Sequence, residues 1–449
     1  MKAMLLGGFV TAGVLIGAGA AEKIDPESIA IRPQAEYFIR GGLPNFYAKL
    51  RGGQPVAIAY LGGSITEQNG WRVRSLDDLR KRFPKSPITE IQAAIGGTGS
   101  ELGAFRLGPD VLRHRPDLVF VEFAVNDNGR RAADILRSME GIVRHIWTEL
   151  PETDICFVYT VTAQDLKLIG ENKTKLSTST MEAVADYYQI PSVYLGSEVI
   201  RLLKDDKLVM KGPESEMIAV SGSSLDAVAA IPRTADGKII FSGDGVHPYL
   251  DTGHVLYAEA LKKALEKIEP AGTPGSHLPL PPANDPACFA DTRAIPLDSP
   301  FVRLSGSVSE VNLDTPQGRP FRNRADKLWK LAPGAELRFR FKGSKVSLYN
   351  LLGPGCGAAD ITLDGKRVLH EYKFFDSYCG YHRIANARIG NDLDPDREHE
   401  LVIKVTGTPF DKRGILMESR RGAFDQAPAD FAPLDVYLAS IFIIGEPVN

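Results

Sequence analysis

Short apolar runs alternate with amphipathic segments throughout residues 56–265, and this pattern constrains the fold more than any other feature of the sequence. Several runs are apolar at nearly every position, as expected of strands that are buried on both faces of a parallel sheet. Between two of them, residues 133–150 repeat apolar side chains at the spacing of one helix face. The sequence therefore predicts an α/β domain in which crossover helices cover a parallel sheet.

The same pattern gives the elements of this domain. We expect strands at residues 56–61, 88–94, 118–124, 155–160 and 192–195. We expect helices at residues 71–82, 133–150, 181–189 and 251–268. Residues 203–240 are rich in Lys, Asp, Ser and Gly and lack a clear period, so we expect a surface loop there or an excursion near the functional site.

The composition changes after residue 268, which indicates a second domain in this chain of 449 residues. Residues 269–283 carry five prolines together with Gly, Thr and Ser, a composition typical of linkers. Beyond them apolar and polar residues alternate, as at Leu337, Phe339 and Phe341, which predicts antiparallel strands. The predicted parts are an α/β domain (22–268), a Pro-rich linker (269–299) and a β-sandwich accessory domain (300–449).

The N-terminus predicts export. Lys2 precedes an apolar stretch at residues 4–16, and small residues up to Ala20 offer a cleavage pattern. The stretch is shorter than the ~20 apolar residues that a spanning helix needs. We therefore expect residues 1–21 to be a signal peptide, cleaved near Ala20, and the mature protein to be secreted or periplasmic. The alternative is an apolar N-terminal helix that stays in the protein.

Charge excludes some classes of function. The formal net charge is −3, with 43% hydrophobic and 24% charged residues, which are ordinary values for a globular protein. Such a chain has neither the basic field that nucleic acid requires nor a polycationic membrane face. We expect no nucleic-acid partner, and no membrane span once the signal peptide is removed.

The cysteines give weaker constraints. No spacing among the four resembles a zinc site, so we expect no metal. Export permits disulfides, and Cys356 and Cys379 could pair, although four cysteines allow three connectivities. Cys156 lies in an apolar run and is expected to behave as a buried hydrophobic residue.

A serine stands where the first strand ends. The sequence Gly-Gly-Ser-Ile-Thr occupies residues 62–66, so the strand delivers Ser64 onto a turn of small residues. A serine hydroxyl is a weak nucleophile that needs an imidazole to take its proton, and the imidazole needs a carboxylate to orient it. Asp244 and His247 lie three residues apart and can hydrogen-bond to each other. We expect these three residues to act as nucleophile, base and orienting carboxylate.

The next two strands end in groups that can hold an oxyanion. Gly97 lies in a Gly-Gly-Thr-Gly sequence after the second strand, and Asn126 follows the third. The carboxyl ends of parallel strands meet at one edge, and a tetrahedral intermediate needs backbone N–H and amide donors there. Taken alone, the glycines could be a flexible turn, with Gly96 in place of Gly97, and Asn126-Asp127 could be a turn that caps the next helix.

Together these motifs resemble the SGNH/GDSL hydrolase superfamily over roughly residues 45–265. The resemblance implies that Ser64 is the nucleophile and His247 the base, with Asp244 orienting His247. It also implies an oxyanion hole formed by the N–H groups of Ser64 and Gly97 and by the Asn126 side chain.

The resemblance further implies a flavodoxin-like, three-layer α/β/α domain with a parallel sheet, followed here by a jelly-roll-like β-sandwich. Two positions depart from the family pattern. Gly63 replaces the aspartate of G-D-S-L, and Ala124 replaces the glycine of G-x-N-D. Neither position carries chemistry in the scheme above, so the departures concern the subfamily and not catalysis.

The resemblance implies ester hydrolysis through an acyl-enzyme, without a metal or organic cofactor. An exported esterase with a β-sandwich is similar to carbohydrate esterases that remove acetyl groups from polysaccharides. Gln68 and Trp71 follow the nucleophile and are candidates for the substrate pocket, although core packing is at least as good an interpretation of Trp71. The sandwich could bind glycan or only pack against the catalytic domain, and both interpretations apply to its aromatic cluster at residues 372–381.

Three alternatives remain open on the sequence. A lipolytic or general short-chain esterase would need a broad apolar groove for the acyl chain. A sugar O-acetyltransferase uses the same residues but transfers the acyl group to a sugar. A glycan-binding module without catalysis would not need the full set of motifs.

Overall fold

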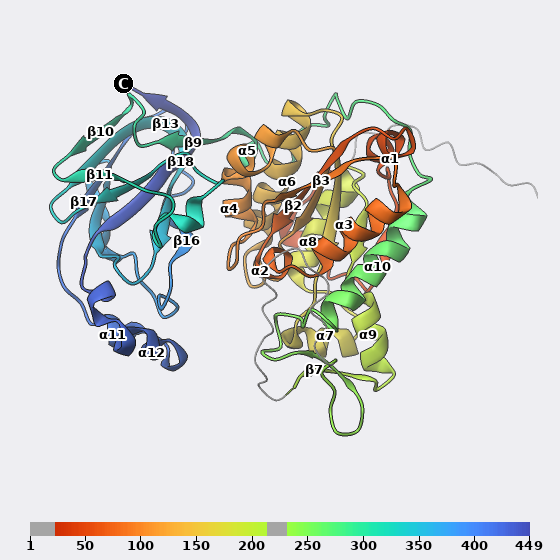
Figure 1. The fold of residues 1–449 in the computed structure, drawn as a ribbon. Coiled ribbons are helices and arrows are strands. Elements are labelled where there is room, and N and C mark those ends of the chain that lie inside the picture. Colours follow the sequence, from red (N-terminus) through yellow and green to blue (C-terminus); the bar gives the residue numbers. More distant parts are fainter. Residues whose placement is uncertain (1–22, 213–230) are drawn as a thin grey trace, which may run out of the picture.

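The computed structural model describes residues 23–212 and 231–449 (Figure 1). The predicted signal peptide, residues 1–21, lies outside the described residues, as does part of the stretch 203–240. Two regions follow each other along the chain, an α/β domain and a domain built on antiparallel strands. In the described part of the chain, no helix is long and apolar enough to cross a membrane.

A six-stranded sheet forms the centre of the first domain. Its order is β1 (Tyr37–Phe38), β6 (Ser192–Tyr194), β5 (Asp154–Tyr159), β4 (Leu118–Glu122), β2 (Val56–Gly62) and β3 (Ile88–Gln92). The five predicted strands are present, and all of them run parallel in the flavodoxin-like order. Strand β1 was not predicted, because two residues are too few to show a period; it pairs antiparallel with β6 at the edge.

Helices cover both faces of this sheet, as predicted. One face packs against α1 (Pro44–Arg51), α3 (Trp71–Arg82), α9 (Ser197–Lys204) and α10 (Gly253–Ile268). The other packs against α4 (Ser100–Phe105), α5 (Leu107–Asp110), α6 (Ala132–Glu149) and α8 (Leu176–Tyr187). Short elements complete the domain: α2 (Ser64–Glu67), α7 (Leu166–Gly170), and the parallel pair β7 (Leu208–Lys211) and β8 (Ile239–Ser242).

Helix α8 begins five residues before the predicted start at 181. Its first turn contains Ser and Thr in place of apolar residues, so the hydrophobic period does not show it. The hydroxyls of Ser177, Ser179 and Thr180 are nevertheless buried and hydrogen-bonded; the Ser177 hydroxyl donates to the Ala124 carbonyl at 2.7 Å. The hydrogen bond ties the start of α8 to the segment that follows β4.

The second domain is a large antiparallel sheet centred on the long strand β13 (Glu336–Leu352). The first half of β13 pairs with β10 and β17, and its second half pairs with β16 and β18. Its other strands are β9 (Thr292–Pro296), β10 (Val302–Ser305), β11 (Val308–Val311), β12 (Leu328–Leu331), β14 (Ala358–Leu363), β15 (Lys366–Lys373), β16 (Arg383–Gly390), β17 (Glu398–Val405) and β18 (Val436–Val448). Two helices, α11 (Lys412–Ile415) and α12 (Glu418–Gln426), lie between β17 and β18 (Figure 1).

The two domains share apolar packing. Phe105, on α4, stacks on Phe442 of β18 with ring centroids 5.1 Å apart and contacts Phe289 at 5.7 Å. In β13 the first half alternates between buried and solvent-facing residues, whereas its second half is almost continuously buried. The second half is therefore covered on both faces, as a strand between a domain core and a domain interface must be.

An ionic contact adds to this interface. The buried carboxylate of Glu101, on α4, lies 2.8 Å from Nζ of Lys345 and 2.9 Å from Nε of Arg388, both in the second domain. Arg130 of the first domain reaches the same carboxylate at 3.1 Å. Burial opposes ionisation of Glu101, but these three cations outweigh it and lower the pKa of the carboxyl group.

The chain between the domains is structured. A 3₁₀ turn (Phe289–Asp291) and β9 lie within the stretch 269–299 that we predicted as a linker, and β9 pairs with β18. The prolines before them rest on the first domain, since Arg144 donates to the Pro281 carbonyl at 2.7 Å. Five prolines favour an extended chain but do not reveal that its carbonyls have partners.

All four cysteines are buried and free. Cys156 lies in β5 with no exposed surface, as predicted. Cys356 and Cys379, the pair considered for a disulfide, are not bonded to each other. Burial raises the pKa of both thiols, that of Cys379 to about 12.

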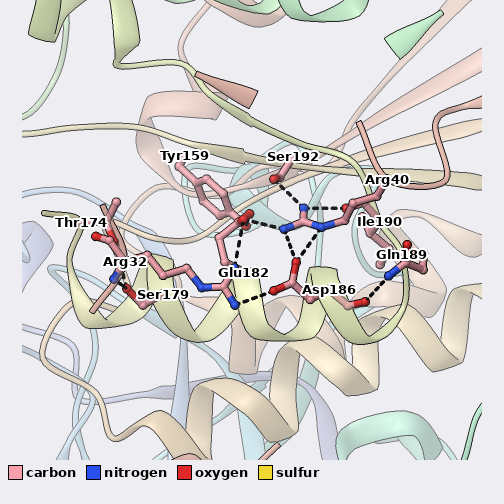
Figure 2. A network of polar contacts seen from close by, with 10 residues as sticks. All are labelled: Arg32, Arg40, Tyr159, Thr174, Ser179, Glu182, Asp186, Gln189, Ile190 and Ser192. Carbon is pink, nitrogen blue, oxygen red and sulfur yellow. Dashed lines mark hydrogen bonds and ion pairs between the residues drawn. The ribbon is translucent and has the colours of Figure 1, made fainter. Parts of the chain in front are cut away.

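A buried polar network fixes the N-terminal segment of the first domain to α8 (Figure 2). Nη2 of Arg40 lies 2.7 Å from the carboxylate of Glu182, which has no exposed surface, and 2.6 Å from Asp186. The Tyr159 hydroxyl donates to Glu182 at 2.7 Å, and Nη1 of Arg40 donates to Ser192 at 2.8 Å. The guanidinium therefore balances a carboxylate that is otherwise costly to bury.

Arg40→Ala should lower the free energy of unfolding by about 3 kcal/mol, because removing one partner leaves a buried charge poorly compensated. Urea unfolding followed by circular dichroism measures the change. Lys81→Ala is the matched control, since Lys81 forms an exposed pair with Asp77 and its loss should leave the unfolding midpoint close to wild type. An Arg40→Ala midpoint equal to that of the control would contradict the assigned role.

Candidate active site

The sheet presents Ser64 at the carboxyl end of β2. The strand ends at Gly62, Gly63 forms the turn, and Ser64 is the first residue of the short helix α2. Glu122, at the end of β4, stabilises this turn. Its carboxylate accepts hydrogen bonds from the hydroxyls of Thr66 at 3.0 Å and Thr160 at 2.9 Å. Burial raises the pKa of Glu122, and both hydroxyl donors oppose that shift.

The structure brings the three predicted residues into one hydrogen-bonded row. His247 Nε2 lies 2.8 Å from Ser64 Oγ, and His247 Nδ1 lies 2.6 Å from Asp244 Oδ2. The Asp-to-His turn follows β8, so residues 183 positions apart in the chain meet at the sheet edge. Its shape is set locally: Asp244 Oδ1 accepts the backbone N–H groups of Val246 and His247, each at 2.8 Å.

These contacts determine the charge of Asp244. Partial burial opposes its ionisation, but the bonds from the His247 ring and from two backbone N–H groups outweigh burial and lower its pKa well below the usual range. An ionised Asp244 accepts a hydrogen bond from Nδ1–H of His247, which leaves Nε2 as the acceptor that faces Ser64. The row can therefore remove a proton from the serine hydroxyl.

The glycine turn after β3 contains the two candidate oxyanion donors, Gly96 and Gly97. The N–H of Gly96 donates to Glu67 Oε2 at 3.0 Å and is thus occupied. For Gly97 the structure gives no hydrogen bond to its N–H within the described residues, and a Cβ at this position would meet nothing within 4 Å. Of the two glycines considered from the sequence, the geometry thus favours Gly97 as an oxyanion donor.

Asn126 and Asp127 are adjacent in the chain but make different contacts. Asp127 is buried and accepts the N–H of Ser100, the first residue of α4, at 3.2 Å. Asp127 therefore holds the start of α4, whereas the next helix along the chain, α6, has no side-chain cap among the described residues, so the capping turn considered from the sequence is absent there. The Asn126 side chain lies against the nucleophile turn, where a Cβ on Gly63 would come within 1.9 Å of Asn126 Oδ1. In this chain, glycine at position 63 leaves the space that the Asn126 amide occupies.

Trp71 packs in the core, which is one of the two interpretations that the sequence left open, and Gln68 is not among the residues that line the cleft. Trp71 has no exposed surface and packs against Tyr60 and Phe120 at 5.4 and 5.9 Å. Gln68 accepts a hydrogen bond from His254 Nε2 at 3.1 Å. Burial lowers the pKa of His254 to about 3, so this histidine is neutral, and its Nδ1 accepts the N–H of Trp71.

A cleft of about 980 Å³ opens above the serine between the two domains. The first domain contributes the Ser64 turn, the glycine turn and the histidine turn. From the second domain come Arg319, Arg322, Arg324, Tyr378, Tyr381 and Arg383. These arginines were not predicted from the sequence, although three of them fall within six residues (319–324).

The predicted aromatic cluster divides between core and surface. Phe374 and Phe375 are buried in the second domain. Tyr378 and Tyr381 are about half exposed, at 50% and 47%, and line the cleft. In the described residues, no group of three or more His, Cys, Asp or Glu side chains is arranged to hold a metal ion.

A parallel sheet that presents a serine, a histidine and an aspartate in this order of contact defines the class of serine hydrolases. Residues 60–209 match the model of the GDSL-like Lipase/Acylhydrolase family. The chain carries a GDSL-like acylhydrolase domain and is a serine hydrolase that acts on esters.

Two solved structures share the two-domain arrangement. Both are crystal structures of a two-domain esterase (CEX) active on acetylated mannans, one of them co-crystallized with mannopentaose. Each is 19% identical to this chain, with 94% of this chain and 100% of that chain covered and TM-scores of 0.66 and 0.67. At this level of identity the likeness shows a common fold. No curated protein matches the sequence significantly.

Gly63→Ala should lower kcat by at least about tenfold, because its backbone (φ −94°) accepts alanine while the added Cβ displaces the Asn126 amide. Turnover of p-nitrophenyl acetate measures the effect. Gly108→Ala is the matched control, since a Cβ there meets nothing within 4 Å. A Gly63→Ala enzyme with the kcat of the control would show that Asn126 does not need this space.

Proposed function

We infer that Ser64 is the nucleophile of an acetylesterase, with His247 as the base and Asp244 as its orienting carboxylate. The observation that carries this proposal is the row of contacts at 2.8 and 2.6 Å from Ser64 through His247 to Asp244. The N–H groups of Ser64 and Gly97 and the Asn126 side chain hold the developing oxyanion.

The reaction proceeds in two halves. His247 takes the hydroxyl proton of Ser64 as Oγ bonds to the ester carbonyl carbon, and the carbonyl oxygen becomes the oxyanion. The intermediate collapses as the bond to the alkoxy oxygen breaks, and His247 gives its proton to the leaving alcohol. A water molecule then attacks the acyl-enzyme, again with His247 as base. Acetate leaves and Ser64 regains its proton.

The substrate class that we propose is a carbohydrate bearing O-acetyl groups. The cleft supports this class because its lining combines four arginines with two half-exposed tyrosines. Tyrosine faces suit sugar rings, since they present an apolar plane and a polar edge. The whole-chain likeness to an esterase active on acetylated mannans points in the same direction.

We further propose that the protein is exported, through the signal peptide expected at residues 1–21. A polysaccharide is too large to enter the cell, so an enzyme that deacetylates one is expected to be secreted or periplasmic. The domain limits 22–268 and 300–449 remain our proposal for the mature chain; β9 lies in the segment between them and pairs with β18 of the second domain.

Ser64→Ala should lower kcat for p-nitrophenyl acetate by about 10³-fold or more, because it removes the attacking atom. Wild-type enzyme should prefer acetate over butyrate and leave the octanoate ester nearly untouched. Ser28→Ala, at an exposed serine, is the control and should behave as wild type. Wild-type enzyme without Ser64-dependent turnover would end the esterase proposal, and octanoate as the best substrate would favour a lipolytic enzyme.

Measuring the release of acetate from acetylated mannan, xylan and pectin tests which polysaccharide the enzyme deacetylates. Wild-type enzyme should release acetate from at least one of these polymers with a kcat/KM above that for p-nitrophenyl acetate, because the cleft adds contacts to the sugar. Transfer of acetyl to an added sugar in place of release would favour the transferase alternative.

We expect kcat/KM to fall at acid pH with the uptake of a single proton. An imidazolium at His247 cannot accept the Ser64 proton, so we expect kcat/KM to be retained where His247 is neutral and to be lost as the pH falls and His247 becomes protonated. Asp244 adds no second step there, since its lowered pKa keeps it ionised. A pH profile with p-nitrophenyl acetate that falls with two protons would contradict this assignment.

A further inference from the structure

One arginine of the second domain crosses the interface and binds the backbone of the first. Arg324 follows the 3₁₀ turn Arg319–Phe321, which is anchored in the second domain by buried Phe321 against Tyr349. Its Nη2 donates to the Ala94 carbonyl at 3.0 Å and to the Gln92 side chain at 3.3 Å. Only 17% of the Arg324 side chain is exposed.

The carbonyl that Arg324 binds belongs to the loop that carries Gly97. Strand β3 ends at Gln92, and residues 93–97 lead from it to the proposed oxyanion donor. The preceding carbonyl, Ala93, is held by the buried Arg106, which also donates to the Gly62 carbonyl at 3.3 Å. Two arginines, one from each domain, thus fix the strand ends on which the nucleophile and the oxyanion donor stand.

Glu67 joins the same assembly from the nucleophile side. Its Oε2 accepts the N–H of Gly96 at 3.0 Å, and its Oε1 lies 4.0 Å from Arg324 Nη2. Arg324 Nη1 lies 3.8 Å from Asp110, which pairs with Arg106 at 2.7 Å. The loop is therefore held at Ala94 by Arg324 and at Gly96 by Glu67, on either side of Ile95.

Domain attachment does not depend on Arg324. Phe105 on Phe442, and Glu101 with Lys345 and Arg388, join the domains elsewhere. Loss of the Arg324 guanidinium should therefore leave the domains joined and release only the loop. A residue that merely joined the domains would affect stability and would leave the hydrolysis of a small ester unchanged.

We propose that Arg324 is a positioning residue for the oxyanion loop, so that ester hydrolysis by the first domain requires a side chain of the second. This inference rests on the proposed function. Oxyanion donors stabilise the transition state only when they are placed to within a fraction of an ångström, and a misplacement of 1 Å can cost about 10²-fold in rate. The second domain thus completes the catalytic centre as well as the substrate cleft.

The test compares full-length Arg324→Ala, Arg324→Lys and Arg113→Ala with wild type on p-nitrophenyl acetate. Arg113→Ala is the matched control, because Arg113 contacts the same segment of the second domain, at Asn323 and Asp326, away from the glycine loop. For Arg324→Ala we expect kcat to fall about 10- to 100-fold with little change in KM. Lysine keeps the charge but has a single donor group in place of a fork, so Arg324→Lys should restore part of kcat.

A folded Arg324→Ala variant whose kcat equals that of Arg113→Ala would overturn the proposal. If Arg324→Ala does not fold, Glu67→Gln and Glu67→Ala decide, because only glutamine keeps an acceptor for the Gly96 N–H. We expect kcat of Glu67→Gln to stay within about threefold of wild type and that of Glu67→Ala to fall about tenfold or more; equal rates in both would overturn the proposal. Absence of Ser64-dependent turnover in wild type would instead refute the proposed function.

Discussion

The packing of α4 against the second sheet is the constraint on which the rest of this molecule depends. The helix follows directly on the glycine turn of the catalytic edge, and its first N–H is bound by Asp127, next to Asn126. Its last residue, Phe105, stacks on Phe442 in the other domain. The six residues of α4 therefore connect the domain interface directly to the proposed oxyanion site.

The electrostatics of this junction follow from the same geometry. Glu101, on the first turn of α4, is buried where the domains meet and has three cations around it. A buried carboxylate is costly unless it is paired, so the two cations of the second domain favour its docking. Since the contact is both apolar and ionic, it specifies one orientation of the domains more strongly than apolar packing could.

The sequence revealed local features well and distant ones poorly. Apolar runs predicted the parallel strands, because β2, β4, β5 and β6 are buried at almost every residue within their own domain, whereas β3 at the sheet edge is only partly buried. The Ser64, His247 and Asp244 assignment rested on the order of motifs along strand ends, and the structure places those side chains in contact. The sequence did not decide whether Trp71 lies in the core or in the substrate pocket, because a hydrophobic residue near a proposed nucleophile is compatible with both.

The arginines of the cleft were missed for another reason. Their role depends on how one domain docks on another, and no period in the sequence encodes that relation. The linker was overestimated in the same way, since five prolines suggest an extended chain but do not show that β9 completes a sheet beside β18. The features that could be predicted lie within a single domain, and the features that could not be predicted depend on contacts between the two domains.

Strand β18 has a consequence for the order in which the molecule is assembled. It follows every other strand of the second sheet in sequence, yet it pairs with β9, β12 and β13 and carries Phe442 into the interface. During synthesis the first domain can fold well before this strand emerges, because domains fold as units from the N-terminus. The turn that carries Ser64 then forms early, whereas the side of the cleft that the second domain contributes is completed among the last events. In a nascent chain, Ser64 would therefore lie in an open, incomplete cleft.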